Sequence, residues 1–328
     1  MFSLDNMSSK AEEVIQILKR FSIHEQSNKQ EVFGAKTLEI LAKCISLQQP
    51  IRLVLPAFPL KNPNPTKVLG HNPDLGEELA LARLEHLCMD MEQAYEHGAE
   101  LYIVSDGLVY GDLMGVSDED SFAYGQALRN MAATKGFHHI KFLRVQDILQ
   151  PAESVEISRE RYLETVPSLR RELGSFLGSA FDVQHELDTN PDTQLTYRSF
   201  VDLLTNDMPF RRNFDQGILE DERRYDDEVR RLAVSMVERL VAYESLLRKS
   251  FPDFIRLSIH RSTGKEKIYI PLLPREGDFG KNPWNCCVAR MANGEIRTGY
   301  MKDFSGVFDL VERDGKPYNF VERSLSVT

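Results

Sequence analysis

Long apolar runs are missing from this 328-residue sequence. No stretch approaches the roughly 20 apolar residues that a membrane-spanning helix needs. The start of the chain, MFSLDNMSSKAEEVIQILKR, also lacks the basic region and apolar block of a secretory signal. We therefore expect a cytoplasmic protein with no membrane partner.

An excess of positive charge is missing too, because the formal net charge is −10 at pH 7. A surface that binds the nucleic-acid backbone needs clustered lysine and arginine. The charge balance therefore argues against nucleic acid as the main partner. A local group of basic side chains can still bind a small phosphorylated molecule.

Cysteine and tryptophan are scarce. The four cysteines are Cys44, Cys88, Cys286 and Cys287, and their spacing fits neither a zinc site nor a disulfide framework. If the adjacent Cys286 and Cys287 lie in a strand, they point to opposite faces. We expect buried free thiols, with a catalytic thiol as the less favoured alternative. Trp284, the only tryptophan, is expected in the core rather than stacked on a ligand.

Short catalytic motifs are also absent. The sequence contains no G-x-S-x-G, no Walker A, no H-E-x-x-H and no G-x-G-x-x-G. The positions of polar side chains relative to the expected strands and helices therefore have to indicate the function.

Alternating strands and helices occupy the first 150 residues. The apolar runs at Ile51–Phe58, Glu100–Ser105 and residues 138–149 predict buried strands. Helical periodicity over Pro73–His97 and Ser117–Lys135 predicts the two helices between them. This alternation is typical of an α/β fold with a parallel sheet.

The flanking regions differ in character. Residues 10–47 predict two helices with a break near Ser27-Asn28, and residues 218–251 form the clearest amphipathic helix of a charged segment. Apolar runs after Pro252 predict further strands. These are residues 255–260, 267–273, 286–291, 296–301 and 307–310. We divide the chain into N-terminal helices over 1–48 and a catalytic domain over 49–328, with a helical segment at about 155–250. A domain boundary near residue 150 is the alternative.

Polar loops follow the first two expected strands, where ligands bind in open α/β sheets. The segment FPLKNPNPTKVLGHNPDLGEE, residues 58–78, contains Lys61, Lys67 and His71. A lysine can bind phosphate as a point charge or form a Schiff base with a carbonyl. Solvated surface groups are the alternative, but four prolines in this loop reduce the entropy lost on ordering it. Glu77 and Glu78 are expected to serve the start of the helix.

The second loop reads SDGLVYGDLMGVSDED, residues 105–120. Ser105 and Asp106 come directly at the strand end, so Asp106 is a candidate general base or anchor for a substrate amine. A turn-forming Asp-Gly is an equally good interpretation. Asp118 and Asp120 are expected to start the next helix rather than to bind a metal.

A third polar cluster, LSIHRSTGKEKIYIPLLP, covers residues 257–274. His260 offers an imidazole, and Arg261 offers a cation suited to bidentate binding of carboxylate or phosphate. An edge-strand pair without a role is the alternative. Lys267 and, further on, Lys281 are additional cations. Together the clusters predict an α/β protein with a basic, proline-stiffened pocket for an anionic small molecule.

The same clusters carry a family resemblance. LPAFPLKNPNPTKVLGHNPDLGEELAL, SDGLVYGDLMGVSDEDSFAYGQALR and HRSTGKEKIYIPLLPREG resemble the isocyanide synthase family of pyoverdine and dityrosine biosynthesis, over residues 50–310. The resemblance implies a Rossmann-like fold without the dinucleotide fingerprint, with a helical insertion and additional C-terminal strands. It also implies conversion of the amino group of an aromatic amino acid, tyrosine or tryptophan, into an isocyanide. Ribulose 5-phosphate supplies the carbon, and no metal or redox cofactor is expected.

That reaction gives the clusters a chemical purpose. The amine attacks the ketone carbon to form an imine, protons are moved, and phosphate is lost as carbon–carbon bonds break, which requires cations and a general acid and base. On this basis the catalytic candidates are Asp106, His260 and Lys61. The candidates for binding substrate or phosphate are Lys67, His71, Ser105, Arg261, Lys267 and Lys281.

One position departs from the family pattern. The family commonly has a histidine after the Pro-Trp of its late motif, whereas this chain has Asn285. Asparagine cannot take up a proton near neutral pH. Two alternatives therefore stay open, an enzyme of the dityrosine type that forms N-formyl-tyrosine and a non-catalytic homologue that binds a sugar phosphate or an amino acid. The resemblance further implies a separate downstream oxygenase that modifies the isocyanide.

Overall fold

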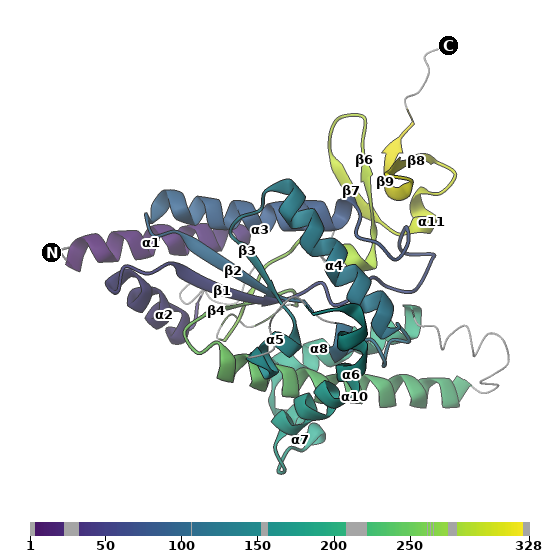
Figure 1. Ribbon diagram of the computed structural model, residues 1–328, viewed down its shortest axis with the longest axis horizontal. Helices are drawn as coiled ribbons and strands as arrows, with labels where there is room; N and C mark the ends of the chain where they lie inside the picture. The colour runs from purple at the N-terminus through teal and green to yellow at the C-terminus, as the bar shows by residue number, and fades with distance from the viewer. Residues whose placement is uncertain are drawn as a thin grey trace.

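A parallel five-stranded sheet forms the centre of the protein, and a smaller four-stranded sheet lies at its C-terminal end (Figure 1). The computed structural model describes residues 4–22, 33–105, 107–151, 157–207, 222–260, 262, 264, 266–274 and 281–323. No helix among these residues is long and apolar enough to cross a membrane.

The central sheet has the strand order β3-β2-β1-β4-β5, and all neighbouring strands are parallel. Its strands are β1 Ile51–Pro56, β2 Ala99–Val104, β3 Ile140–Leu143, β4 Ile255–Ser258 and β5 Ile268–Tyr269. The helices α3 (Leu75–Ala94) and α4 (Asp118–Lys135) connect β1 to β2 and β2 to β3. This order is that of the first five strands of a doubly wound sheet, and its direction reverses between β1 and β4. The predicted α/β fold with a parallel sheet is confirmed.

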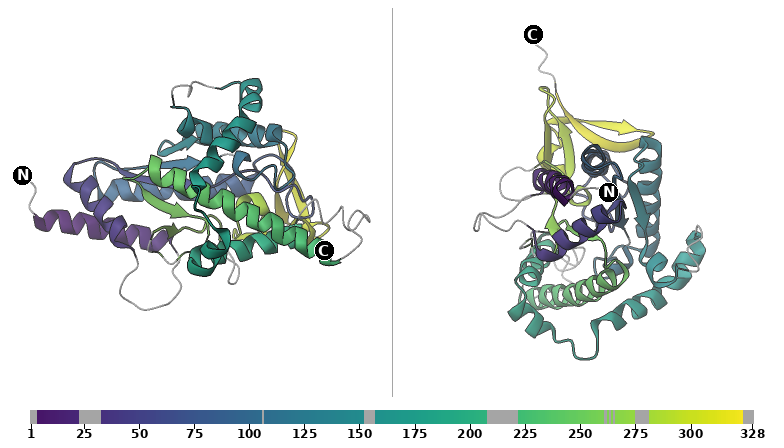
Figure 2. Two further views of the ribbon diagram at one scale, coloured as in Figure 1. Left: turned by 90° about the horizontal axis from the view of Figure 1, so that it is seen from below. Right: turned by 90° about the vertical axis from the view of Figure 1, so that its left-hand side faces the viewer.

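The pleat of β1 separates two hydrophobic cores. Leu53 and Leu55 pack into a cluster with side chains from α1, α2, α3 and α4, whereas Val54 packs into a cluster with α6 and α10. Successive side chains of a strand point to opposite faces, so both faces of the sheet are covered. In the right-hand view of Figure 2, the C-terminal sheet lies at the top of the molecule and α10 at the bottom.

Helices account for the N-terminal segment and the insertion between β3 and β4. They are α1 Leu4–Phe21, α2 Ala35–Ser46, α5 Val145–Leu149, α6 Arg159–Gly174, α7 Val183–Thr189, α8 Pro191–Asp207 and α10 Glu222–Ser250. The two predicted N-terminal helices and the amphipathic helix within residues 218–251 are confirmed. The predicted break at Ser27-Asn28 lies outside the described residues. The long helix α10 contacts both α6 and α8, and α6 and α10 pack against the face of the sheet that carries Val54.

Two predictions of local structure were wrong. The strand predicted over residues 138–149 is only β3, because Asp147 accepts the N–H of Arg144 at 2.7 Å and the chain turns there into α5. The smaller sheet contains β6 Cys287–Arg290, β7 Ile296–Gly299, β8 Phe308–Arg313 and β9 Lys316–Glu322, and β9 was missed. The sequence did contain a signal for β9, because the Asp314-Gly315 pair favours a two-residue hairpin turn. In the structure both residues have the positive φ of such a turn.

Gly107, directly after the carboxyl end of β2, tests how tightly this edge packs. A Cβ at Gly107 would lie 3.0 Å from the carbonyl oxygen of Pro59 and closer still to Ser121, so α4 would have to shift. We expect Gly107→Ala to lower the free energy of unfolding in urea by roughly 1–3 kcal/mol. Gly174→Ala is the matched control, because nothing lies within 4 Å of its added Cβ. Equal stability of the two variants would contradict this packing.

Candidate active site

The carboxyl ends of β2, β1 and β4 lie side by side in the middle of the central sheet (Figure 1). Ser105 follows β2, Phe58 and Lys61 follow β1, and His260 follows β4. The reversal of strand order between β1 and β4 is the place where open α/β sheets bind ligands. The topology therefore brings together segments that the sequence singled out separately.

A strained turn ends β1. Phe58 is fully buried and has φ of +55°, a conformation that large side chains rarely adopt. The Ser105 hydroxyl donates to the Phe58 carbonyl oxygen at 2.6 Å, and the Phe58 ring meets Trp284 edge-on at 5.2 Å. The hydroxyl of Ser105 thus holds the turn rather than facing a ligand. Trp284 is a core residue, as predicted.

Beyond this turn, Lys61 enters a buried ion network. Its ammonium lies 2.8 Å from Asp74 Oδ2 and 2.8 Å from both carboxylate oxygens of Glu77, and it donates to the Pro283 carbonyl oxygen at 3.2 Å. The side chains of Lys61, Asp74 and Glu77 are at most 1% exposed. The network joins the loop after β1, the start of α3 and the segment before β6.

Asp74 and Glu77 also begin α3. Asp74 Oδ1 accepts the N–H of Gly76 at 2.7 Å, and Glu77 Oε2 accepts the N–H of Asp74 at 2.9 Å, which is a capping box. From α4, the Tyr124 hydroxyl donates to Glu77 Oε1 at 3.0 Å. The expectation that Glu77 serves the helix start is confirmed.

This network holds two carboxylates against one ammonium. Burial raises the pKa of Asp74 to about 7 in spite of the Lys61 ammonium, and the Glu77 carboxylate adds to the rise. Burial opposes the charge of Lys61, yet the carboxylates of Asp74 and Glu77 raise the pKa of its amine above the usual range. An imine requires a neutral amine, so the arrangement favours Lys61 as a fixed charge over Lys61 as a nucleophile.

Asn285, the position at which the family resemblance predicts a histidine, lies beside this network. Its Oδ1 accepts from Asn62 Nδ2 at 3.1 Å, and the N–H of Asn62 donates to the Trp284 carbonyl oxygen at 2.9 Å. Asn62, the residue after Lys61, is therefore hydrogen-bonded directly to Asn285. Asn62 was missed in the sequence, since nothing local connects it to a residue more than 200 positions away.

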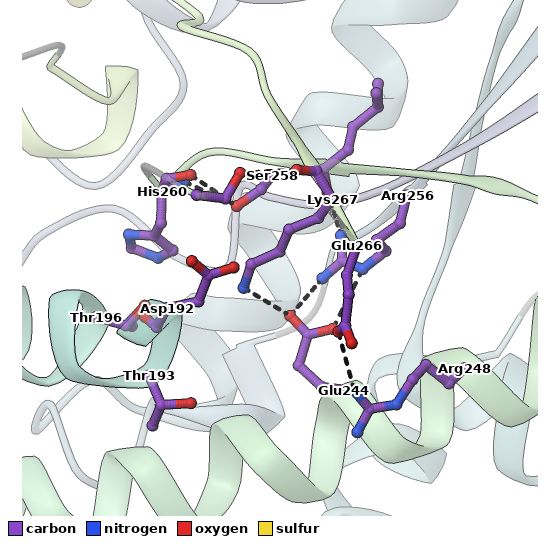
Figure 3. A network of polar contacts seen from close by, with 12 residues as sticks. Asp192, Thr193, Thr196, Glu244, Arg248, Arg256, Ser258, His260, Glu266 and Lys267 are labelled. Carbon is purple, nitrogen blue, oxygen red and sulfur yellow. Dashed lines mark hydrogen bonds and ion pairs between the residues drawn. The ribbon is translucent and has the colours of Figure 1, made fainter. Parts of the chain in front are cut away.

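On the other side of β1, His260 is the principal titratable side chain. Figure 3 shows its imidazole above α8, and the Phe200 ring of α8 meets it edge-on at 6.3 Å. Burial, reinforced by the Lys267 ammonium, lowers the pKa of His260 to about 4. None of the described residues hydrogen-bonds to its ring nitrogens. The arrangement presents a neutral imidazole that can accept a proton.

The Lys267 ammonium forms an ion pair with Glu244 of α10 (Figure 3). Its ammonium lies 3.6 Å from Glu244 Oε1, and Arg256 donates to the same oxygen at 2.8 Å. Burial opposes the charge of Glu244, but Arg256 and Lys267 lower the pKa of this carboxyl to about 2. Glu244 neutralises charge that the sequence assigned to phosphate binding, and it was missed because it lies in the helical insertion.

The remaining predicted site residues fall in different places. Lys67 and Lys281 meet at the ring of Tyr300, 4.3 and 5.1 Å from its centroid, whereas His71 is exposed on its loop. Asp106 and Arg261 lie outside the described residues. The lysine pair is brought together from positions more than 200 residues apart, as phosphate binding would require.

Acidic residues and cysteines behave as expected. Asp120 starts α4, since its N–H donates to Ser117 at 3.0 Å, and Asp118 pairs with Arg170.

All four cysteines are buried and free. Cys286 packs into the large core and Cys287 into the core of the smaller sheet, so the adjacent thiols do point apart. Among the described residues, no three His, Cys, Asp or Glu side chains gather to hold a metal ion.

Fold and geometry thus define an α/β protein with its candidate site at the reversal of a parallel sheet. The model of the pyoverdine/dityrosine biosynthesis protein family matches residues 41–310. The chain belongs to this family, which confirms the resemblance carried by the three polar segments.

Individual relatives extend the match to nearly the whole chain. The chain is 36% identical to "Isocyanide synthase xanB" of Aspergillus fumigatus over 95% of its length, but spans only 42% of that protein. It is 29% identical to "L-tyrosine isonitrile synthase" of Pseudomonas aeruginosa, covering 94% of this chain and 92% of that one. The crystal structure of the PvcA protein of Pseudomonas aeruginosa superimposes with a TM-score of 0.81 at 26% identity, covering 96% of this chain and all of that one.

Lys61 provides a direct test of the buried network. We expect Lys61→Met to lower the free energy of unfolding by about 3–5 kcal/mol at pH 8, because it leaves two buried carboxylates without their cation. The pKa of Asp74 is already raised, and removing the ammonium raises it further. A raised carboxyl pKa favours the folded state at low pH and loses this effect as pH rises. The loss of unfolding free energy in Lys61→Met should therefore be smaller at pH 5 than at pH 8, by about 1 kcal/mol or more.

Lys43→Met is the matched control for this measurement. Lys43 also lies 2.8 Å from a carboxylate, that of Asp253, but both side chains are more than half exposed. Its loss should change the urea unfolding free energy by less than about 1 kcal/mol at either pH. Equal effects of the two substitutions would refute the argument from burial.

Proposed function

We propose that the protein is an isocyanide synthase. It converts the amino group of an L-amino acid, with tyrosine or another aromatic favoured, into an isocyanide for secondary metabolism, and ribulose 5-phosphate donates the carbon. The observation that carries the proposal is the alignment, over nearly the full length of both chains, with a protein named L-tyrosine isonitrile synthase. The fungal match named an isocyanide synthase points the same way.

The proposed reaction is of the lyase type. The substrate amine attacks the ketone carbon of ribulose 5-phosphate and water leaves, which gives an imine. Protons are then moved between carbon and oxygen, and phosphate is lost as carbon–carbon bonds break. The proposal involves no metal or redox cofactor, and a separate tailoring oxygenase would use the isocyanide product.

His260 supports the proton transfers that this chemistry needs. Its lowered pKa keeps the imidazole neutral at pH 5–8, so it can accept a proton throughout this range. The Phe200 ring meets this imidazole and also packs against Tyr110, with ring centroids 5.8 Å apart, so aromatic side chains surround His260 on the α8 side. The proposal of an aromatic substrate accords with such surroundings.

Asn285 favours a second candidate. If the histidine that the family resemblance predicts here acts on the substrate, the amide of Asn285 cannot replace it in proton transfer, as expected for a non-catalytic homologue that binds the same molecules. A dityrosine-type enzyme that releases N-formyl-tyrosine is the further alternative, since a formamide is a hydrated isocyanide.

One assay separates these functions. The purified protein is incubated with ribulose 5-phosphate labelled at the ketone carbon and a mixture of the twenty amino acids, and the label is followed by mass spectrometry. Label in one isocyano acid, with an isocyanide infrared band, supports the proposal and names the substrate. Label in a formamide supports the dityrosine-type reaction. Binding of the sugar phosphate without any labelled product supports the non-catalytic homologue.

His260→Gln tests the proton-transfer role. We expect kcat for the labelled product to fall by about 10²–10⁴-fold, because glutamine keeps the polarity of the side chain but cannot accept a proton. His185→Gln is the control, since His185 is exposed on α7 and should leave kcat unchanged. A His260→Gln variant with wild-type kcat would remove His260 from the mechanism.

A further inference from the structure

Three lysine side chains surround one tyrosine on the side of the molecule where the smaller sheet lies. The ammonium groups of Lys67, Lys281 and Lys302 lie 4.3, 5.1 and 5.8 Å from the centroid of the Tyr300 ring. Lys67 comes from the loop after β1, Lys281 from the segment before β6, and Lys302 from α11 (Met301–Phe304). We call this group the Tyr300 lysine cluster.

Contacts between these segments fix the cluster in place. The N–H of Lys302 donates to the Thr66 carbonyl oxygen at 3.3 Å, and the Cys287 thiol donates to the Lys67 carbonyl oxygen at 3.2 Å. The Lys281 ammonium donates to the Thr298 carbonyl oxygen at 3.2 Å. Hydrogen bonds among these segments therefore help to hold the three lysines close to Tyr300.

Two of the three lysines, Lys281 and Lys302, have no acidic partner in the part of the chain that the structure describes. Among the described residues, no carboxylate lies within 4 Å of the Lys281 or Lys302 ammonium. The nearby Asp303 carboxylate accepts the N–H of Tyr300 at 2.7 Å. By contrast, Lys141 lies over the ring of Tyr102 but is paired with a glutamate. An aromatic ring attracts cations, but like charges gathered on one ring repel each other and favour an anion among them.

We propose that the Tyr300 lysine cluster binds the phosphate group of a phosphate monoester. Such a group carries a charge of about −1.5 to −2 near neutral pH, and lysine binds phosphate as a point charge. As a statement about the co-substrate, this rests on the proposed function, where the monoester is ribulose 5-phosphate. Lys302 and Tyr300 then belong to the binding site together with Lys67 and Lys281.

The position of the cluster suits a sugar phosphate whose reacting carbon lies elsewhere. The chain runs from Lys67 back to Lys61 and Asn62, and from Lys281 forward to Trp284 and Asn285, where the two segments are hydrogen-bonded. The two segments that carry Lys67 and Lys281 therefore also meet beside the buried ion network, and the proposal places the carbon chain of the ligand on that side of the lysines.

Calorimetric titration of the intact protein with three probes tests the proposal: inorganic phosphate, ribulose 5-phosphate and unphosphorylated ribulose. We expect both phosphorylated probes to bind, with affinity falling as ionic strength rises, and ribulose to bind at least tenfold more weakly than ribulose 5-phosphate. If ribulose binds as tightly as ribulose 5-phosphate, the proposal is overturned. Binding of inorganic phosphate alone would keep the anion site and reject ribulose 5-phosphate as its ligand.

Variants locate the binding. Lys302→Gln should weaken the binding of both phosphorylated probes roughly tenfold, and Lys302→Arg should restore most of the affinity. The double variant Lys67→Gln, Lys281→Gln should lose measurable binding. Lys249→Gln is the matched control, since Lys249 is an exposed lysine 5.4 Å from the centroid of the Phe176 ring. Because Lys302 is exposed, its substitution should leave the thermal unfolding midpoint unchanged.

The outcomes separate this inference from the proposed function. If Lys302→Gln and the double variant bind ribulose 5-phosphate as tightly as the wild type, the cluster is not the phosphate site, whatever reaction the protein performs. If these variants lose affinity while the wild type forms no labelled isocyano acid, the phosphate site stands and the proposed reaction fails.

Discussion

The ion network around Lys61 is the constraint on which the candidate site depends. Removing an ammonium and two carboxylates from water costs several kcal/mol per ion, and only close, complete hydrogen bonding offsets this cost. Here the Lys61 ammonium donates to Asp74 at the end of the loop after β1, to Glu77 in α3 and to the carbonyl oxygen of Pro283. The network stabilises the structure only when all three segments are in place. It therefore fixes the loop that runs from the strained turn at Phe58 to the Tyr300 lysine cluster.

The site has two sides that come from different parts of the chain. One side is built from the proline-rich loop and the segment before β6, and it carries fixed positive charge. The other side follows β4 and rests on the helical insertion, which contributes Phe200 and Glu244 and leaves His260 neutral. Separation of fixed charge from a neutral base suits a reaction that holds a phosphate at one end of a molecule and moves protons at another.

Much of the fold follows from local signals in the sequence. The strands β1 and β2 are short apolar runs, α3 and α4 have helical periodicity and caps, and these gave the correct α/β fold. Roles in the site depended on contacts that local patterns do not contain. Lys61 pairs with Asp74, which caps α3, and Lys267 pairs with Glu244 of α10 in the helical insertion. Neither pairing has a periodicity or a motif, so the sequence singled out Lys61 and Lys267 as cations without showing that carboxylates already neutralise them.

The central position of β1 also has a consequence for how the protein forms. One edge of β1 pairs with β2, about 50 residues away, but the other pairs with β4 through Leu53 and Ile255, about 200 residues away. Contacts of such long sequence separation form late and slowly. During synthesis on the ribosome, β1, β2 and β3 emerge well before β4, so one hydrogen-bonding edge of β1 stays open until β4 has been made. An open apolar edge is prone to pairing with other chains, and this fold therefore places a demand on chaperones in the cell.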